Sequence, residues 1–78
     1  MKLEILTPEK EIFKGDIKSV TLPGTLGEFE ILNQHAPIIS TLTSGSIKIV
    51  TGKNEKNNFD INGGVVEMLN NKIIVLAN

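Results

Sequence analysis

Apolar and polar residues alternate along short stretches of the chain with a period of two. Residues 2–5, 47–49 and 59–61 place isoleucine, leucine or phenylalanine at every second position, with a charged residue between them. This period is that of a β-strand, in which successive side chains point to opposite faces of a sheet. The pattern predicts nine short strands: Leu3–Leu6, Glu11–Phe13, Ile17–Leu22, Glu28–Leu32, Ile38–Leu42, Ser46–Thr51, Asn58–Ile61, Gly64–Leu69 and Lys72–Leu76.

Residues that favour turns separate these strands. Asn70-Asn71 stands between two apolar runs and predicts a tight hairpin, because asparagine tolerates a positive φ. Thr7–Lys10 has the composition of a helix start, but Gly15 limits any helix to about two turns, so a turn is predicted. Short strands divided in this way are typical of an all-β sandwich or barrel. The other turn signals are Pro23-Gly24, Gly27, Pro37, Ser44-Gly45, Thr51-Gly52 and Asn62-Gly63-Gly64.

The length predicts a single domain over residues 1–78, with no internal repeat and no linker. A domain of this size buries only about 60% of the surface that its unfolded chain exposes. Small domains therefore often gain stability from disulfides, a metal or a partner. The chain has no cysteine and one histidine, which leaves no ligand set for a structural zinc. A partner subunit is the remaining source of stability.

The charge balance excludes several kinds of ligand. A net charge of -1 and a pI near 5.7 argue against nucleic acid, which requires a basic surface. All eight cations are lysines, so arginine is not available for two-point binding of phosphate. No cofactor motif is found. The longest apolar run, Ile73–Ala77, is five residues long, against the roughly 20 that a spanning helix needs, so we expect a cytosolic protein without membrane insertion.

The segment Gly24–Glu30 is the most unusual part of the sequence. It lacks the Gly-Lys-Ser/Thr ending and the following helix of a phosphate-binding loop, so a turn in which glycines supply a positive φ is favoured. Strand alternation places Glu28 and Glu30 on one face, with Phe29 and Ile31 on the other. The two carboxylates either face solvent or meet a basic partner. A small hydrolase that uses both of them is an alternative.

His35 is the only histidine and the only side chain that ordinarily titrates near neutrality. Catalysis by histidine requires a partnered nucleophile, but there is no cysteine, and the nearby hydroxyls of Ser40 and Thr41 belong to no recognisable motif. We therefore predict that His35 is hydrogen-bonded within a turn and fixes the approach to Pro37.

Six segments, in this order, resemble the N-terminal domain of the epsilon subunit of F-type ATP synthases, which is called delta in mitochondria. None of them is strong alone, but the ordered set covers nearly the whole chain. The segments are Val20–Gly24, Gly27–Leu32, His35-Ala36-Pro37, Leu42 with Gly45–Ile49, Phe59 with Gly63–Glu67, and Ile73–Ala77.

The resemblance implies a flattened sandwich of about ten short strands. It implies a non-catalytic rotor subunit of the central stalk, which links the gamma subunit to the c-ring so that hydrogen ion transport is coupled to ATP synthesis. In bacteria this complex lies at the cytoplasmic side of the inner membrane. By resemblance, Gly27, Glu28, Phe29 and Glu30 contact the polar loops of the c-ring, which carry arginine. His35, Ala36 and Pro37 would shape the neighbouring turn.

Two departures from the family pattern affect these expectations. The family commonly has glycine where this chain has Glu30, so a positive φ at that position would be costly. Many bacterial relatives continue into a C-terminal helical hairpin that inhibits rotation and in some cases binds ATP. The sequence as given ends at Asn78 without it, so neither activity is expected of these residues.

A free-standing β-barrel adaptor is the second alternative. It would keep the fold but bind a peptide or a small ligand, and it predicts an enclosed pocket or an open sheet edge. The stalk interpretation instead predicts a broad exposed apolar patch, because a stable interface buries roughly 800 Å² on each partner.

Overall fold

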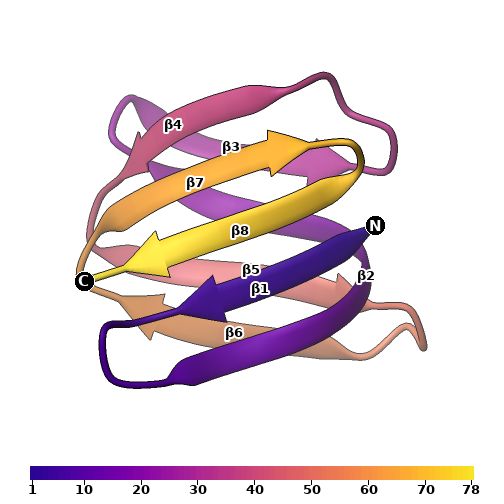
Figure 1. The fold of residues 1–78 in the computed structure, drawn as a ribbon, viewed down its shortest axis with the longest axis horizontal. Coiled ribbons are helices and arrows are strands. Elements are labelled where there is room, and N and C mark those ends of the chain that lie inside the picture. Colours follow the sequence, from indigo (N-terminus) through magenta and orange to yellow (C-terminus); the bar gives the residue numbers. More distant parts are fainter.

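The computed structural model describes all residues from 1 to 78 and contains eight strands and no helix (Figure 1). No helix is long and apolar enough to cross a membrane. The all-β class is therefore confirmed, and seven of the predicted strands are found to within two residues at either end. The strands are β1 (Lys2–Leu6), β2 (Glu11–Gly24), β3 (Gly27–Leu32), β4 (Ile38–Leu42), β5 (Gly45–Thr51), β6 (Lys56–Ile61), β7 (Gly64–Leu69) and β8 (Lys72–Ala77).

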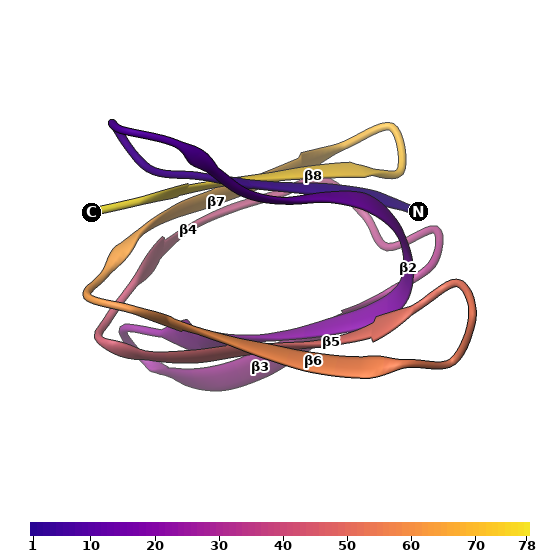
Figure 2. The same ribbon diagram turned by 90° about the horizontal axis from the view of Figure 1, so that it is seen from below.

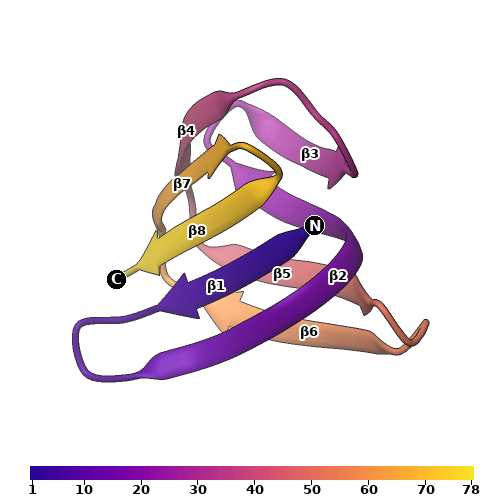
Figure 3. The same cartoon turned by 45° about the vertical axis from the view of Figure 1, so that its right-hand side comes forward.

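Strand β2 is continuous, so the prediction of two separate strands at Glu11–Phe13 and Ile17–Leu22 is wrong. Gly15 lies within β2 and pairs with Leu3. A glycine inside a strand often marks a bend, and β2 does bend after this position. Its first half pairs with β1 and its second half with β3 and β5, so one strand passes from one layer to the other (Figure 3). This continuity reduces the nine predicted strands to eight.

The turn signal at Pro23-Gly24 is also misplaced. Both residues belong to the end of β2, where they pair with Glu28 and Gly27 of β3. Thr25 and Leu26 form the two-residue connection. On the other side of β2, the carbonyl of Pro23 accepts a hydrogen bond from the amide of Thr43, and Gly24 pairs with Leu42 of β4.

The strands form two layers (Figure 2). The first layer contains β4, β7, β8, β1 and residues 11–16 of β2, in that order. The second layer contains β3, residues 17–24 of β2, β5 and β6. All paired strands are antiparallel except β1 and β8, which run parallel. The arrangement is a sandwich whose layers are joined by the bent strand β2.

The core lies between the layers and contains no buried polar or charged side chain. The rings of Phe13 and Phe59, whose centroids are 5.6 Å apart, pack against it and bring β2 and β6 together. Fifteen buried residues make up the core: Leu3, Ile5, Ile17, Val20, Leu22, Ile31, Leu42, Ile47, Ile49, Ile61, Val66, Met68, Ile73, Val75 and Ala77.

The predicted hairpin at Asn70-Asn71 is confirmed. Both asparagines have a positive φ, 52° and 61°, and Leu69 pairs with Lys72 across the turn. Two central residues with positive φ match the twist of a hairpin. Thr7–Lys10 is a turn as predicted, and the Thr7 hydroxyl accepts a hydrogen bond of 3.1 Å from the Lys10 amide.

Candidate functional site

Strand β3 presents two carboxylates on the outer face of the second layer. Glu28 and Glu30 are exposed, Phe29 is half-buried and Ile31 is fully buried, so the predicted alternation is confirmed. Glu28 Oε2 lies 3.5 Å from Lys48 Nζ on β5, and both side chains are more than half exposed. The acidic pair therefore stands on an open surface.

Glu30 occupies an ordinary strand position opposite Thr21. It is not among the residues with positive φ, so a side chain at this position causes no backbone strain. The exposed carboxylates also offer a substrate no enclosure, and small-molecule sites are usually concave and largely apolar. This geometry gives no support to a hydrolase built on Glu28 and Glu30.

The loop between β3 and β4 contains His35. The His35 amide donates to the carbonyl of Leu32 at 3.2 Å, and ring atom Nδ1 lies 2.7 Å from the carbonyl oxygen of Ala36. The prediction of a hydrogen-bonded turn histidine is thus confirmed.

Asn71, in the β7–β8 turn, ties this loop to the rest of the fold. Its Oδ1 accepts from the Gln34 amide and its Nδ2 donates to Asn33 Oδ1, each at 2.9 Å. We call these two hydrogen bonds the clamp. They hold the loop at Gln34, whose φ is positive at 65°. The sequence pattern identified the hairpin at Asn71 but not this contact, because its partners lie 37 and 38 residues away.

The two groups of predicted site residues do not lie together. Gly27 begins β3 and Leu32 ends it, so Gly27–Glu30 lies towards one end of this strand and His35-Ala36-Pro37 follows the other end (Figure 1). The structure also brings together no group of three or more residues suited to hold a metal ion.

One part of the outer face of the first layer is apolar. The rest of this face carries charged residues, namely Lys2, Glu4, Lys14, Asp16, Glu67 and Lys72. Strand pairing aligns Thr41, Val65, Leu76 and Leu6 in one row across β4, β7, β8 and β1. Val65 and Leu76 are 41% and 56% exposed, and Ile39, on the same face of β4, is 74% exposed. These side chains have no partner within the chain that covers them, although their burial would be favourable.

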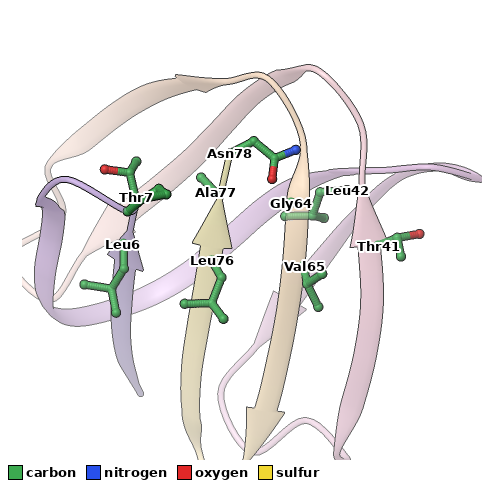
Figure 4. A pocket seen from close by; sticks show the side chains of 10 residues that line it. Leu6, Thr7, Thr41, Leu42, Gly64, Val65, Leu76, Ala77 and Asn78 are labelled. Atoms are coloured by element: carbon green, nitrogen blue, oxygen red, sulfur yellow. The ribbon is translucent and has the colours of Figure 1, made fainter.

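An open hollow of about 760 Å³ lies along this row. Figure 4 shows the side chains of Leu6, Leu76 and Val65 on neighbouring strands. Thr7, Asn78 and Gly64 lie at the strand ends beside them. We call the surface formed by Leu6, Ile39, Val65 and Leu76 the apolar face.

The sequence contains a signal for the apolar face. In Ile73–Ala77 every residue is apolar, so both faces of that strand are apolar, and one of them has to point away from the core. The outer face of the second layer carries Glu28, Glu30, Lys48 and Asp60, and Asp60 accepts a 2.6 Å hydrogen bond from Ser46. Both outer faces thus carry charged residues, and the apolar face occupies one part of the first layer.

Comparison with known proteins gives a consistent result. The family model described as "ATP synthase, Delta/Epsilon chain, beta-sandwich domain" matches residues 1–78. The chain is 40% identical over 76 residues to the ATP synthase epsilon chain of Chlorobium limicola, covering 97% of this chain and 86% of the relative. It is 46% identical over 77 residues to the epsilon chain of a Nitratiruptor species, of which it spans 60%.

Two solved structures share the fold. One is the Euglena gracilis mitochondrial ATP synthase, in a structure of OSCP, F1 and c-ring, with a TM-score of 0.89 and 18% identity over 96% of this chain and 48% of that one. The other is the central stalk and c-ring of the Tetrahymena thermophila mitochondrial ATP synthase. Its TM-score is 0.79 at 25% identity, and the match covers 99% of this chain and 62% of that one.

Proposed function

The chain belongs to the delta/epsilon family of ATP synthase subunits, and on this premise we propose that it is a central-stalk subunit that links gamma to the c-ring. In this role it transmits ion-driven rotation of the ring to gamma and thereby supports ATP synthesis by other subunits. It performs no catalysis and binds no cofactor. Its place is peripheral, at the cytoplasmic side of a bacterial inner membrane, as part of the complex.

The observation that carries this proposal is the apolar face. Ile39 and Leu76 are 74% and 56% exposed in a domain of only 78 residues. Contiguous exposed apolar surface marks an interaction site on a soluble protein. Because a stable interface buries roughly 800 Å² per partner, a sheet face of this kind suits a permanent subunit contact. We assign this face to gamma.

The c-ring contact is assigned to Gly27, Glu28, Phe29 and Glu30, on the other layer. The two carboxylates are exposed and point outward, as a contact with arginine-bearing loops requires. An exposed pair of this kind adds on the order of 0–1 kcal/mol of affinity, so its main effect is on orientation. His35, Ala36 and Pro37 follow β3 and set its exit, with Asn71 holding the loop.

The test uses two preparations from the same source, the isolated F1 complex and the whole F-type ATP synthase. Both are depleted of this subunit. In the first assay we would add back Leu76→Lys, with Leu32→Lys as the control. Leu32 is 54% exposed, but its strand belongs to the second layer. A charge on the apolar face should abolish stoichiometric co-elution with F1, whereas the control should bind. If both variants bind as the unmodified chain does, the assignment of gamma to this face is wrong.

The second assay concerns the acidic pair. Glu28→Lys with Glu30→Lys should leave F1 binding intact but lower proton-coupled ATP synthesis in reconstituted vesicles. The control, Asp60→Lys, changes a charge on β6 of the same layer and should support normal synthesis. If the unmodified chain, well folded, elutes apart from an F1 complex that retains its other subunits, the stalk function itself is refuted.

A further inference from the structure

Leu26 is the most exposed of the large apolar residues, with a relative exposure of 103%. It occupies the second position of the two-residue turn between β2 and β3. The conformation that favours glycine falls on Gly27, whose φ is +132°, whereas neither Thr25 nor Leu26 has a positive φ. The backbone of the turn therefore does not require leucine at position 26. A single exposed leucine would need no explanation, but this one borders a second hollow.

The second hollow has a volume of about 390 Å³ and lies between the β2–β3 turn and strands β4 and β7. Leu26 and Phe29 line one side, and Ile39 and Val65 line the other. None of its lining residues is charged. The hollow shares Thr41 and Val65 with the hollow on the apolar face, so the two form a continuous uncharged surface around β4.

The turn that carries Leu26 is fixed to β4 by several contacts. The Thr25 amide donates to the Thr41 carbonyl at 3.2 Å, and the two threonine hydroxyls lie 2.9 Å apart. Gly24 also pairs with Leu42. Because the turn is held in place, little conformational freedom is lost when a partner contacts Leu26, and preorganisation of this kind favours affinity.

The uncharged lining of the second hollow favours an apolar occupant. An arginine side chain from a c-ring loop would find no carboxylate here, and desolvating an unpaired charge is costly. An apolar side chain would bury surface against Leu26, Ile39 and Val65 at no such cost. We propose that Leu26 is an anchor residue for gamma and that an apolar segment of gamma extends from the apolar face into the second hollow. This inference rests on the proposed stalk function.

The experiment measures the affinity of the whole chain for the depleted F1 complex by titration calorimetry. The variants are Leu26→Ser and Leu26→Met, with Leu32→Ser as the matched control. Leu26 directly precedes β3 and Leu32 is its last residue, and both are exposed. We expect Leu26→Ser to weaken binding by at least about tenfold, as loss of an interface hot spot does. Leu26→Met should bind nearly normally and Leu32→Ser should bind as the unmodified chain does.

Ile39→Thr, on the opposite wall of the second hollow, provides an independent check. It keeps the β-branched shape but places a hydroxyl in the proposed contact, so it should also weaken F1 binding. Unfolding temperatures should be unchanged for Leu26→Ser, because the side chain contacts no core residue. Unaltered F1 affinity of Leu26→Ser would overturn the inference, as would a defect limited to c-ring coupling. If the unmodified chain fails to bind F1, the proposed function fails instead.

Discussion

Gly64 should be the glycine least tolerant of substitution. It begins β7 between Leu42 of β4 and Ala77 of β8, with φ at +151°. A Cβ at this position would collide with the carbonyl oxygen of Leu76 and lie 3.0 Å from Ala77 Cα. Both obstacles are backbone atoms of a paired strand, so they cannot move aside as a flexible side chain would.

The cost of Gly64→Ala has two parts. A non-glycine residue in this region of φ costs about 1–3 kcal/mol. Forcing an extra carbon into a packed site costs about 1–3 kcal/mol more. The expected loss of unfolding free energy is therefore about 2–6 kcal/mol, which is a large share of what a domain of this size has.

Two other glycines allow the backbone cost and the steric cost to be measured separately. Gly27 has φ at +132°, and a Cβ added there would have no neighbouring atom within 4 Å, so Gly27→Ala should show only the backbone cost of about 1–3 kcal/mol. Gly52 has no such φ, and the nearest atom to its Cβ would be 3.7 Å away. Gly52→Ala should be neutral or stabilising by about 0.4–1 kcal/mol, because alanine restricts the unfolded chain.

Urea unfolding followed by circular dichroism measures the series. With a slope near 1 kcal/mol per molar urea, the midpoint for Gly64→Ala should fall about 1–3 M below that for Gly27→Ala. If Gly64→Ala is already unfolded without urea while Gly27→Ala is folded, the expected order of stability is also confirmed. Equal midpoints for these two variants would show that the sheet relaxes around the extra carbon, and the steric argument would be wrong.

Three further changes probe the clamp, the acidic pair and the core by the same urea assay. Asn71→Gly keeps the positive φ but loses the hydrogen bonds to the β3–β4 loop, so it should cost about 1–2 kcal/mol; an unchanged midpoint would mean that the clamp adds nothing. Glu28→Gln should change stability by less than about 1 kcal/mol, because its ion pair with Lys48 is solvated; a larger loss would contradict this. Ile31→Ala should cost about 2–5 kcal/mol, since Ile31 is fully buried, and a loss below about 1 kcal/mol would place it outside the core.

Strand positions were predictable because one face of most strands is buried. Alternation at residues 47–49 and 59–61 reports that burial directly, and these segments lie in β5 and β6 as expected. The errors come from glycine and proline. Gly15 lies between two predicted strands and Pro23 is a turn signal, but pairing with β1 and β3 keeps both within one strand. The conformational preference of a single residue stabilises a turn less than a continuous ladder of hydrogen bonds stabilises a strand. A sequence pattern does not reveal that ladder.

The site was predictable to a lesser degree. Alternation correctly placed Glu28 and Glu30 on an outer face, because that depends only on strand period. The hollow beside Leu26 was not predictable, because Ile39 and Val65, which also line it, lie on strands distant in sequence. The resemblance drew attention to Gly27–Glu30, whereas the uncharged surface beside it emerges only once β4 and β7 lie next to the β2–β3 turn.

The distribution of apolar residues connects stability with function in this domain. Fifteen residues fill the core, yet six large apolar residues, among them Leu26, Ile39 and Leu76, remain exposed. Burying such side chains against a partner stabilises each by about 1.5–3 kcal/mol, comparable with the modest stability that a small core supplies. A partner that covers the apolar face would therefore hold the sandwich folded as well as in place. In the proposed stalk, the subunit would resist rotational load mainly while it is bound to gamma. Hydrogen exchange of the β4, β7 and β8 amides should slow on F1 binding, and unchanged exchange there would contradict this coupling.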